Sequence, residues 1–373
     1  MHRSHPKGAV PQTAPPTRDP GAAHADAPVT PAAASTSSAS GALRRRRLLG
    51  LGVLVLLVAA GMLAGLAVGA RSLAPAEVWG ALVSPTGTEA DVVVRSLRLP
   101  RTVLALVVGA ALGLAGALAQ GHTRNPLADP GLLGVNAGAA LSVVLAVNLL
   151  GITSPLGYVW FAFAGALLAG ATVFALGSAG PGGSTPVTLA LAGAALTALL
   201  TSLTQAVVLT DVTTLDAYRF WAVGSVAGRG LDVLVPLLPF LAAGTLLALL
   251  QAPGLNALAL GEDVARSLGQ RVLATRVLGL LAVTLLTGSA VAACGPIAFV
   301  GLVVPHAVRF LTGPDHRWLL PGSALAGSAL LLAADVAGRV AVRPGELQAG
   351  IVLALVGAPF FVALVRRRRL VTL

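Results

Sequence analysis

Few residues in this sequence are placed to perform covalent chemistry. Cys294 is the only cysteine, which excludes an internal disulfide and a multi-cysteine metal site and favours a small apolar packing role. Lys7, the only lysine, lies in no Walker A motif, so the chain does not bind ATP through a P-loop of its own. The sequence also lacks a nucleophile elbow and an HExxH motif. A membrane-embedded enzyme is therefore a disfavoured alternative.

The histidines and carboxylates give no metal site and no ion-carrying site. His122, His306 and His316 have no metal-ligand spacing on one helix, and we interpret them as polar interface residues near the inner surface. All fourteen acidic residues fall in the N-terminal tail, in loops or at span ends, with Asp335 and Glu346 nearest to a span. Secondary transporters usually place carboxylates at mid-membrane. An ion-coupled secondary transporter is thus the weaker alternative, and a separate ATPase is the natural energy source.

The most unusual charge pattern is Arg98-Leu-Pro-Arg101. These two arginines share roughly one helix face, and we expect them at the outer N-terminus of the second span, where the helix dipole disfavours cations. Arg339 and Arg343 add positive charge on the same side. An acidic partner docking from outside would explain the cluster. Binding of lipid phosphates or of loop acids such as Glu89 is the alternative, because arginine suits both.

A second charged feature is the loop from Leu255 to Gly269 on the inner side. Gly261 divides it into two short helical pieces, and Glu262 and Asp263 lie in the first turn of the second piece, which suits the helix dipole. Four side chains of these pieces can form an apolar face: Leu258, Val264, Ala265 and Leu268. Such a helix can bind in a groove of a cytosolic partner. A helix lying among lipid headgroups is the alternative.

Membrane-spanning helices must position these residues. Hydrophobic residues make up 56% of the 373 residues and charged residues 10%, with a mean hydropathy of +0.86. A soluble domain carries about 25% charged residues. We predict an all-α, polytopic membrane protein with about ten transmembrane helices. The predicted spans are 48–70, 101–121, 132–151, 158–177, 188–209, 232–251, 272–293, 296–312, 318–336 and 347–365.

The charge distribution predicts that both termini are cytoplasmic. The inner loops and ends carry fourteen arginines and four acids, whereas the outer loops carry eight arginines and eight acids. Residues 1–43 are rich in Pro, Ala, Ser and Thr and are predicted to be a disordered cytoplasmic tail, with residues 44–373 forming the transmembrane domain. The net charge of +11 includes arginine blocks beside the first and last spans. It therefore indicates membrane anchoring and not nucleic-acid binding.

Several motifs follow one another along the chain: Arg98-Leu-Pro-Arg101, the stretch from Gly121 through Asn125-Pro-Leu-Ala-Asp-Pro-Gly131 to Val135, the loop Leu260 to Gly269, Cys294-Gly-Pro-Ile-Ala-Phe-Val-Gly-Leu-Val-Val-Pro-His306, Pro344-Gly-Glu-Leu-Gln-Ala-Gly350 and Gly357-Ala-Pro359. In this order they resemble the permease subunits of ABC importers for iron-siderophores, haem and vitamin B12, which form the FecCD type. The resemblance covers roughly residues 48–369.

The resemblance implies a type II importer architecture and an assembly of several subunits. Expected partners are a second permease subunit, identical or related, two cytosolic ATP-binding subunits and an extracytoplasmic substrate-binding protein, with no cofactor and no metal site in this chain. Arg98, Arg101 and Arg339 match the arginines that receive glutamates of the binding protein. The loop from Gly261 to Gly269 matches the coupling helices. The region of Gly183, Ser184 and Thr185 resembles the cytoplasmic gate, and an iron(III)-siderophore is the favoured cargo.

Overall fold

The structure is a computed structural model that describes residues 35–69, 72–179, 185–343 and 345–366. These residues form helices and connecting segments, with no strand among them. The elements are α1 (Ser35–Ala67), α2 (Pro75–Val83), α3 (Glu89–Val92), η1 (Val93–Arg98), α4 (Leu99–Thr123), η2 (Pro130–Leu133), α5 (Val135–Leu150), α6 (Pro155–Ser178), α7 (Pro186–Val208), α8 (Val212–Ala222), α9 (Leu231–Leu234), η3 (Val235–Leu237), α10 (Leu238–Leu250), α11 (Ala252–Ala259), α12 (Glu262–Ser267), α13 (Val272–Cys294), α14 (Val300–Thr312), α15 (His316–Ala341) and α16 (Ala349–Arg366).

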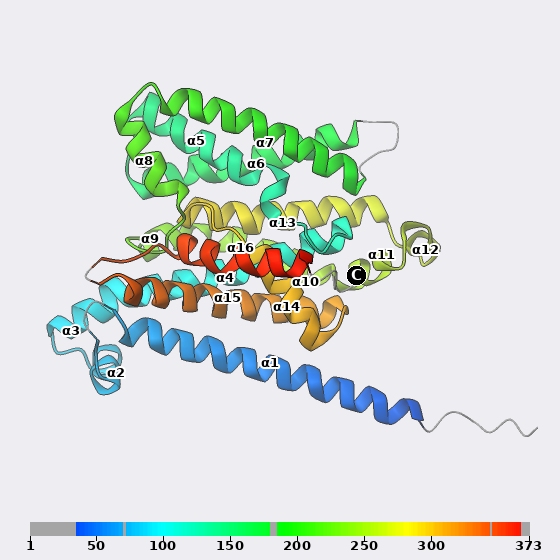
Figure 1. Ribbon diagram of the computed structural model, residues 1–373, viewed down its shortest axis with the longest axis horizontal. Coiled ribbons are helices and arrows are strands. Elements are labelled where there is room, and N and C mark those ends of the chain that lie inside the picture. The colour runs from blue at the N-terminus through cyan, green and yellow to red at the C-terminus, as the bar shows by residue number, and fades with distance from the viewer. Residues whose placement is uncertain (1–34, 70–71, 180–184, 344, 367–373) are drawn as a thin grey trace, which may run out of the picture. The chain divides into compact units, whose positions relative to one another are not determined.

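The apolar helices match the predicted spans. Seven helical segments of the described chain are long and apolar enough to cross a membrane, and three shorter apolar helices, within α5, α14 and α16, fall on the remaining predicted spans. We call the end of the bundle that carries α11 and α12 the inner end, and the end that carries α2 and α3 the outer end (Figure 1).

The chain divides into two units, Met1–Leu43 and Arg44–Leu373. Residues 1–34, most of the predicted tail, lie outside the described residues. Residues 35–43 form the first turns of α1, so this part of the predicted disordered tail is helical.

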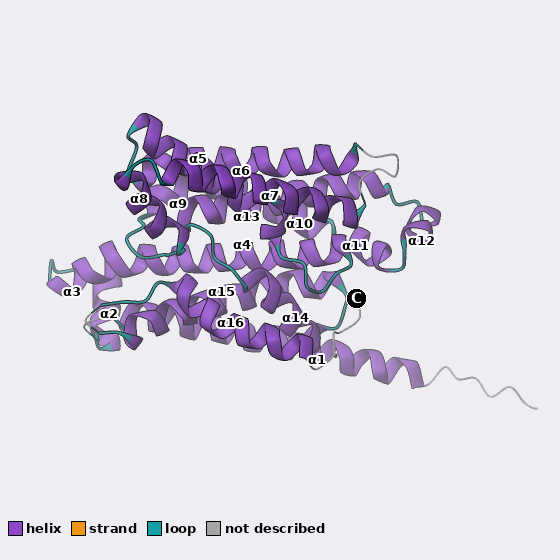
Figure 2. Ribbon diagram, turned by 45° about the horizontal axis from the view of Figure 1, so that its top comes forward, coloured by secondary structure: helices purple, strands orange, loops and turns teal. Residues whose placement is uncertain are grey.

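α4 is the central helix of the second unit. It contacts α10, α13, α14 and α15, while α5, α6 and α7 form a neighbouring group (Figures 1 and 2). Small residues allow the close approach: a Cβ added at Gly109 would lie 2.5 Å from the carbonyl oxygen of Gly327, and one at Gly113 would lie 2.1 Å from that of Ser323. Backbone contact of this kind is how helices associate in lipid, where packing replaces the hydrophobic effect.

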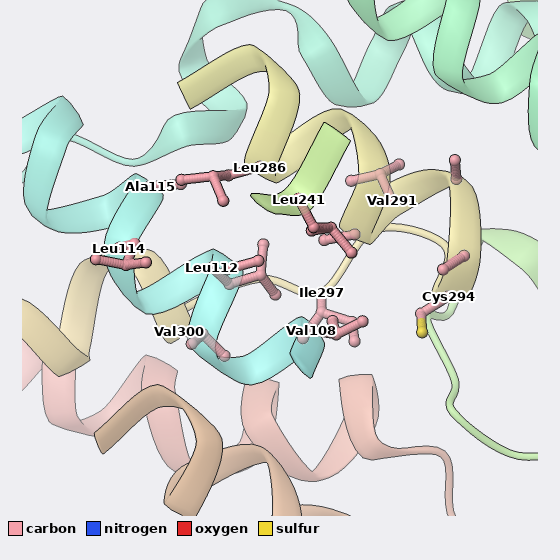
Figure 3. Close-up of a cluster of buried hydrophobic side chains, with 14 of the residues drawn as sticks. Val108, Leu112, Leu114, Ala115, Leu241, Leu286, Val291, Cys294, Ile297 and Val300 are labelled. Carbon is pink, nitrogen blue, oxygen red and sulfur yellow. The ribbon is translucent and has the colours of Figure 1, made fainter. Parts of the chain in front are cut away.

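A continuous apolar core lies where α4, α10 and α13 meet. Figure 3 shows side chains from these helices pointing toward one another. Cys294 lies fully buried at the edge of this core. Its environment agrees with the packing role predicted from the sequence.

The second span begins earlier than predicted. Helical structure runs without a break through α3, η1 and α4. The wider π-helical turn of η1 accommodates Pro100, which has no N–H to donate, because the Leu99 N–H bonds five residues back to the Val94 carbonyl. Arg98 and Arg101 therefore lie inside a helical run, and the expectation that they occupy a helix N-terminus is wrong.

The helix at the predicted span 296–312 is shorter than predicted, because α14 begins at Val300. The segment that joins α13 to α14 is irregular, and Gly295 in it has a φ of 75°. Phe299, a non-glycine residue, has a φ of 68°. It packs against Gly357 of α16, where an added Cβ would lie 2.5 Å from the Phe299 Cβ. Irregular backbone at this depth is tolerated because protein surrounds it.

Candidate functional site

The structure brings the three predicted docking arginines together at the outer end. Arg98 and Arg101 come from the junction of η1 and α4, and Arg339 comes from the last turn of α15. Asp335 lies one helical turn before Arg339, on the same face of α15. Its side chain is 2% exposed. These four residues and Glu346 are called the outer arginine cluster below.

Two arginines of the cluster hold Asp335 between them. Arg101 places Nη2 2.7 Å from Asp335 Oδ1, and its Nη1 lies 2.7 Å from Glu346 Oε2. Arg339 pairs with the other oxygen of Asp335. The carboxylate of Asp335 therefore makes two ion pairs, and the one with Arg101 links α15 to α4.

Arg98 and Arg339 also bind the C-terminal end of α1. The last carbonyls of a helix have no intrahelical donors and carry a partial negative charge, so guanidinium groups suit them. Both arginines are buried, at 7% and 6% exposed. The acceptors are the carbonyls of Leu66 (2.8 Å) and Ala67 (2.8 Å) for Arg98, and of Gly65 (2.7 Å) and Val68 (3.3 Å) for Arg339. Anchoring of α1 is a role that the sequence analysis missed.

The inner end of α1 is held in the same manner, with the roles reversed. Arg47 of α1 donates from Nε to the Thr312 carbonyl at 2.8 Å, and Arg46 donates to the Phe310 carbonyl, both near the end of α14. Arg47 Nη1 also lies 3.5 Å from Asp315 Oδ2. Partial burial alone would raise the pKa of Asp315, but its hydrogen bond from Asn256 and its arginine neighbours hold that pKa below the usual value. Part of the arginine block predicted to anchor the chain to lipid thus fastens α1 to α14.

The inner loop forms the two helical pieces that the sequence predicts. α11 and α12 are separated at Gly261, whose φ of 108° suits glycine. Glu262 and Asp263 lie in the first turn of α12, and Gly269 follows its end with a φ of 81°. The loop projects from the inner end of the bundle beyond α13 (Figures 1 and 2).

The single apolar face predicted for this loop is wrong. Leu258 and Ala265 are buried against Val272 and hold the loop to α13. Val264 and Leu268 point away, at 44% and 60% exposed. Because α12 is short and α11 meets it across Gly261, two of the four residues face the bundle and the other two face away from it. We call Val264 and Leu268 the exposed apolar pair.

A cavity of about 490 Å³ lies beside this loop at the inner end. Its walls come from the end of α4, the start of α7 and the first turns of α13, and they include His122, Asp129, Val187, Ala190 and Arg276. Burial raises the pKa of Asp129, and a 2.8 Å hydrogen bond from the Gly131 N–H partly offsets that rise. The cavity lies between the first turns of α7 on one side and α4 and α13 on the other.

The predicted gate region is described only in part. Gly183 and Ser184 lie outside the described residues. Thr185 caps the N-terminus of α7, because its hydroxyl accepts the Thr188 N–H at 3.1 Å and its own N–H donates to the Thr188 hydroxyl at 2.9 Å. Pro186 follows at the first helical position, which strengthens this start of α7.

The inner histidines are not all interface residues. His306 and His316 are buried, and His316 Nδ1 lies 2.9 Å from Asn256 Oδ1. The described residues hold no group of three or more His, Cys, Asp or Glu side chains that could bind a metal ion. A buried contact that the sequence did not reveal joins α14 to α4, where Arg309 Nη1 donates to Gln120 Oε1 at 2.6 Å.

Known proteins have sequences similar to this chain. A family model described as the FecCD transport family matches residues 55–367. A ferric enterobactin transport system permease protein of Escherichia coli (strain K12) is 52% identical over 85% of this chain and 94% of the relative. A hemin transport system permease protein of Yersinia pestis is 41% identical over 74% of this chain and 83% of the relative.

A solved structure gives the same picture in three dimensions. It is described as a metal-chelate type ABC transporter in an inward-facing conformation, and it superimposes with a TM-score of 0.74 at 30% identity. The match covers 86% of this chain and 99% of the other.

Proposed function

The chain belongs to the FecCD transport family and is a permease subunit of ATP-binding-cassette importers, and we propose that it carries an iron(III)-siderophore or a related metal chelate across the cell membrane. The observation that carries this proposal is the 52% identity to a ferric enterobactin permease over 85% of the chain. As a transport subunit it is not itself an enzyme. It is a multi-pass inner membrane protein, and the proposed orientation has both termini in the cytoplasm.

The proposed assembly has five chains: two permease subunits, two cytosolic ATP-binding subunits and one extracytoplasmic binding protein. The exposure of α7 supports a second permease subunit. Only 11% of the most apolar part of α7 is buried within this chain, although α7 carries polar residues such as Ser202 and Gln205. A helix of this composition is expected to face a partner or an aqueous pathway and not lipid alone.

Uptake should depend on ATP and not directly on the proton gradient. The complete complex is reconstituted into vesicles with ATP inside, and radiolabelled ferric enterobactin is the probe. An uncoupler should leave uptake unchanged, because Asp335, an acid that lies within a predicted span, is held by two arginines. Loss of uptake at constant ATP would instead support a secondary transporter, and haemin as a second probe separates the two chelate classes.

We place the docking of the binding protein at the outer arginine cluster. The cluster carries three arginines and two acids, which gives a net charge of +1, and exposed Arg343 follows Arg339 by four residues in the sequence. Arg101 faces the most accessible acid, because Glu346 is 46% exposed. Arg98 and Arg339 are buried and hydrogen-bond to the end of α1. A carboxylate of the binding protein would therefore compete with Glu346 for Arg101.

Two neutral substitutions should change docking in opposite directions. Glu346→Gln removes the competing carboxylate and should tighten binding of the binding protein, whereas Arg101→Gln should weaken it. An exposed pair is worth about 0.2–1 kcal/mol, so each change is expected to be up to about fivefold in Kd. Calorimetric titration at low and at high salt provides the measurement, and added salt should shrink both effects. Equal Kd values for both variants would favour the lipid-phosphate interpretation.

A further inference from the structure

The two neighbouring acids of α12 differ in what they contact. Asp263 is fully exposed and pairs with Arg266 of its own helix at 3.0 Å. Glu262 is 23% exposed and turns toward the bundle. We propose that Glu262 is the positioning residue through which a movement of α12 is passed to α4 and α13. This inference rests on the proposed function, in which α12 binds the ATP-binding subunit.

One carboxylate joins three helices. Glu262 Oε1 contacts Arg276 of α13 and lies 3.8 Å from Nη2 of Arg124, the residue that ends α4. Glu262 Oε2 lies 3.1 Å from Nη2 of Arg266, on α12 itself. The Arg276 side chain is only 12% exposed, so this pair is less screened by water and salt than a surface pair. A displacement of α12 therefore changes the charge contacts of two spans at once.

α4 and α13 are packed too tightly near these arginines to move independently. Gly279, about one turn after Arg276, faces His122 of α4, and a Cβ added there would lie 1.8 Å from the His122 Nε2. Toward the middle of the bundle the same two helices share the core around Ala115 and Leu286 (Figure 3). Close-packed interiors transmit displacement because they compress little. A pull on either arginine should thus shift both helices together.

The cavity beside α7 provides the space for that shift. α7 packs on α5 and α6, whereas the cavity of about 490 Å³ separates its first turns from α4 and α13. Movement of α4 and α13 toward or away from α7 changes the volume of this cavity without compressing a packed core. Ala190 of α7 lines the cavity and is exposed, so a thiol placed there reports on it.

The test measures this cavity in the complete complex. Cys294, the only native thiol of this chain, is buried, so Ala190→Cys supplies the one accessible thiol of this chain, and the complex without Ala190→Cys gives the background labelling. Its labelling by a maleimide is compared with and without ATP and vanadate, in the parent and with Glu262→Gln added. We expect the ATP-dependent change in labelling rate to fall about threefold to tenfold with Glu262→Gln, while ATP hydrolysis by the complex continues. Asp216→Asn, which removes the carboxylate of an exposed ion pair on α8, should leave the change intact.

A second experiment, a charge exchange, distinguishes the proposed positioning role from a merely structural role of Glu262. Combining Glu262→Arg with Arg276→Glu restores an ion pair of opposite orientation between α12 and α13, and it should recover most of the labelling response. Labelling that responds to ATP equally with and without Glu262→Gln overturns the inference, as does a charge exchange that recovers nothing while the complex assembles and hydrolyses ATP. If no ATP-binding subunit associates with the unsubstituted chain, the proposed function fails instead.

Discussion

Replacing Leu268 with aspartate is expected to abolish ATP-driven uptake while the protein stays folded in the membrane. Leu268 ends α12 and is 60% exposed, so the chain's own packing loses little. Val264 and Leu268 form an exposed apolar pair on a loop in which Leu258 and Ala265 are buried and Leu260 is exposed. A carboxylate at the centre of the apolar contact would be buried without a partner when the ATP-binding subunit docks.

The expected loss is large because a few central residues carry most of the energy of an interface. Loss of such a residue costs about 2 kcal/mol or more, which is at least about thirtyfold in affinity. Co-purification of the ATP-binding subunit and uptake of radiolabelled ferric enterobactin are the two measurements. Leu268→Met keeps the apolar volume and should behave like the parent. Leu258→Asp, at a buried position, should instead lower the amount of folded protein.

Uptake that survives Leu268→Asp with the ATP-binding subunit still bound would contradict the assignment of α12 as the docking element. The alternative of a helix lying among headgroups would then be preferred, because a single added charge there costs little.

The sequence predicted the number and order of the membrane helices because hydropathy acts over whole spans. It predicted their ends less well where local geometry decides. α14 begins at Val300 and not at 296, since Gly295 and Phe299 adopt positive φ angles that only their packing neighbours explain. The second span begins at α3 because a π-helical turn accommodates Pro100 without interrupting the helix. Neither feature has a signal in composition or periodicity.

The candidate site was predicted in its residue types but not in its contacts. The spacing of Arg98 and Arg101 indicated a shared face, and the structure places both in one cluster with Arg339. It did not indicate that two of these arginines reach the end of α1, since that contact joins residues more than thirty positions apart. The sequence also did not indicate that Glu262 pairs with Arg276. Their pairing depends on how α12 folds back onto α13, which no local pattern specifies.

Removing the carboxylate of Asp335 is expected to destabilise the fold more than any other single charge removal in the outer arginine cluster. Arg101 and Arg339 pair with it at 13% and 6% exposed, and Asp335→Ala would leave both with one fewer counter-charge. Breaking a buried pair costs about 3–5 kcal/mol. Because Glu346 and the α1 carbonyls remain as partners, the lower end of this range is expected, with a fall in Tm of about 5 °C.

Cys294 supplies the measurement, since it is the only thiol in the sequence and becomes reactive only when the core opens. Thermal unfolding in detergent, followed with a thiol-reactive dye, should show the fall for Asp335→Ala but less than about 1 kcal/mol of change for Glu346→Ala, whose partner contact is half exposed.

A neutral substitution, Asp335→Asn, separates a structural carboxylate from a proton carrier. In a proton-coupled transporter, neutralising the essential acid stops transport while the fold remains, because the acid must work in both protonation states. In this chain Asp335 is held between the guanidinium groups of Arg101 and Arg339, and Arg339 also positions α1. Asp335→Asn should therefore lower the stability of the fold. The protein that remains folded should keep ATP-dependent uptake. A stable Asp335→Asn protein without uptake would assign Asp335 to the transport reaction itself.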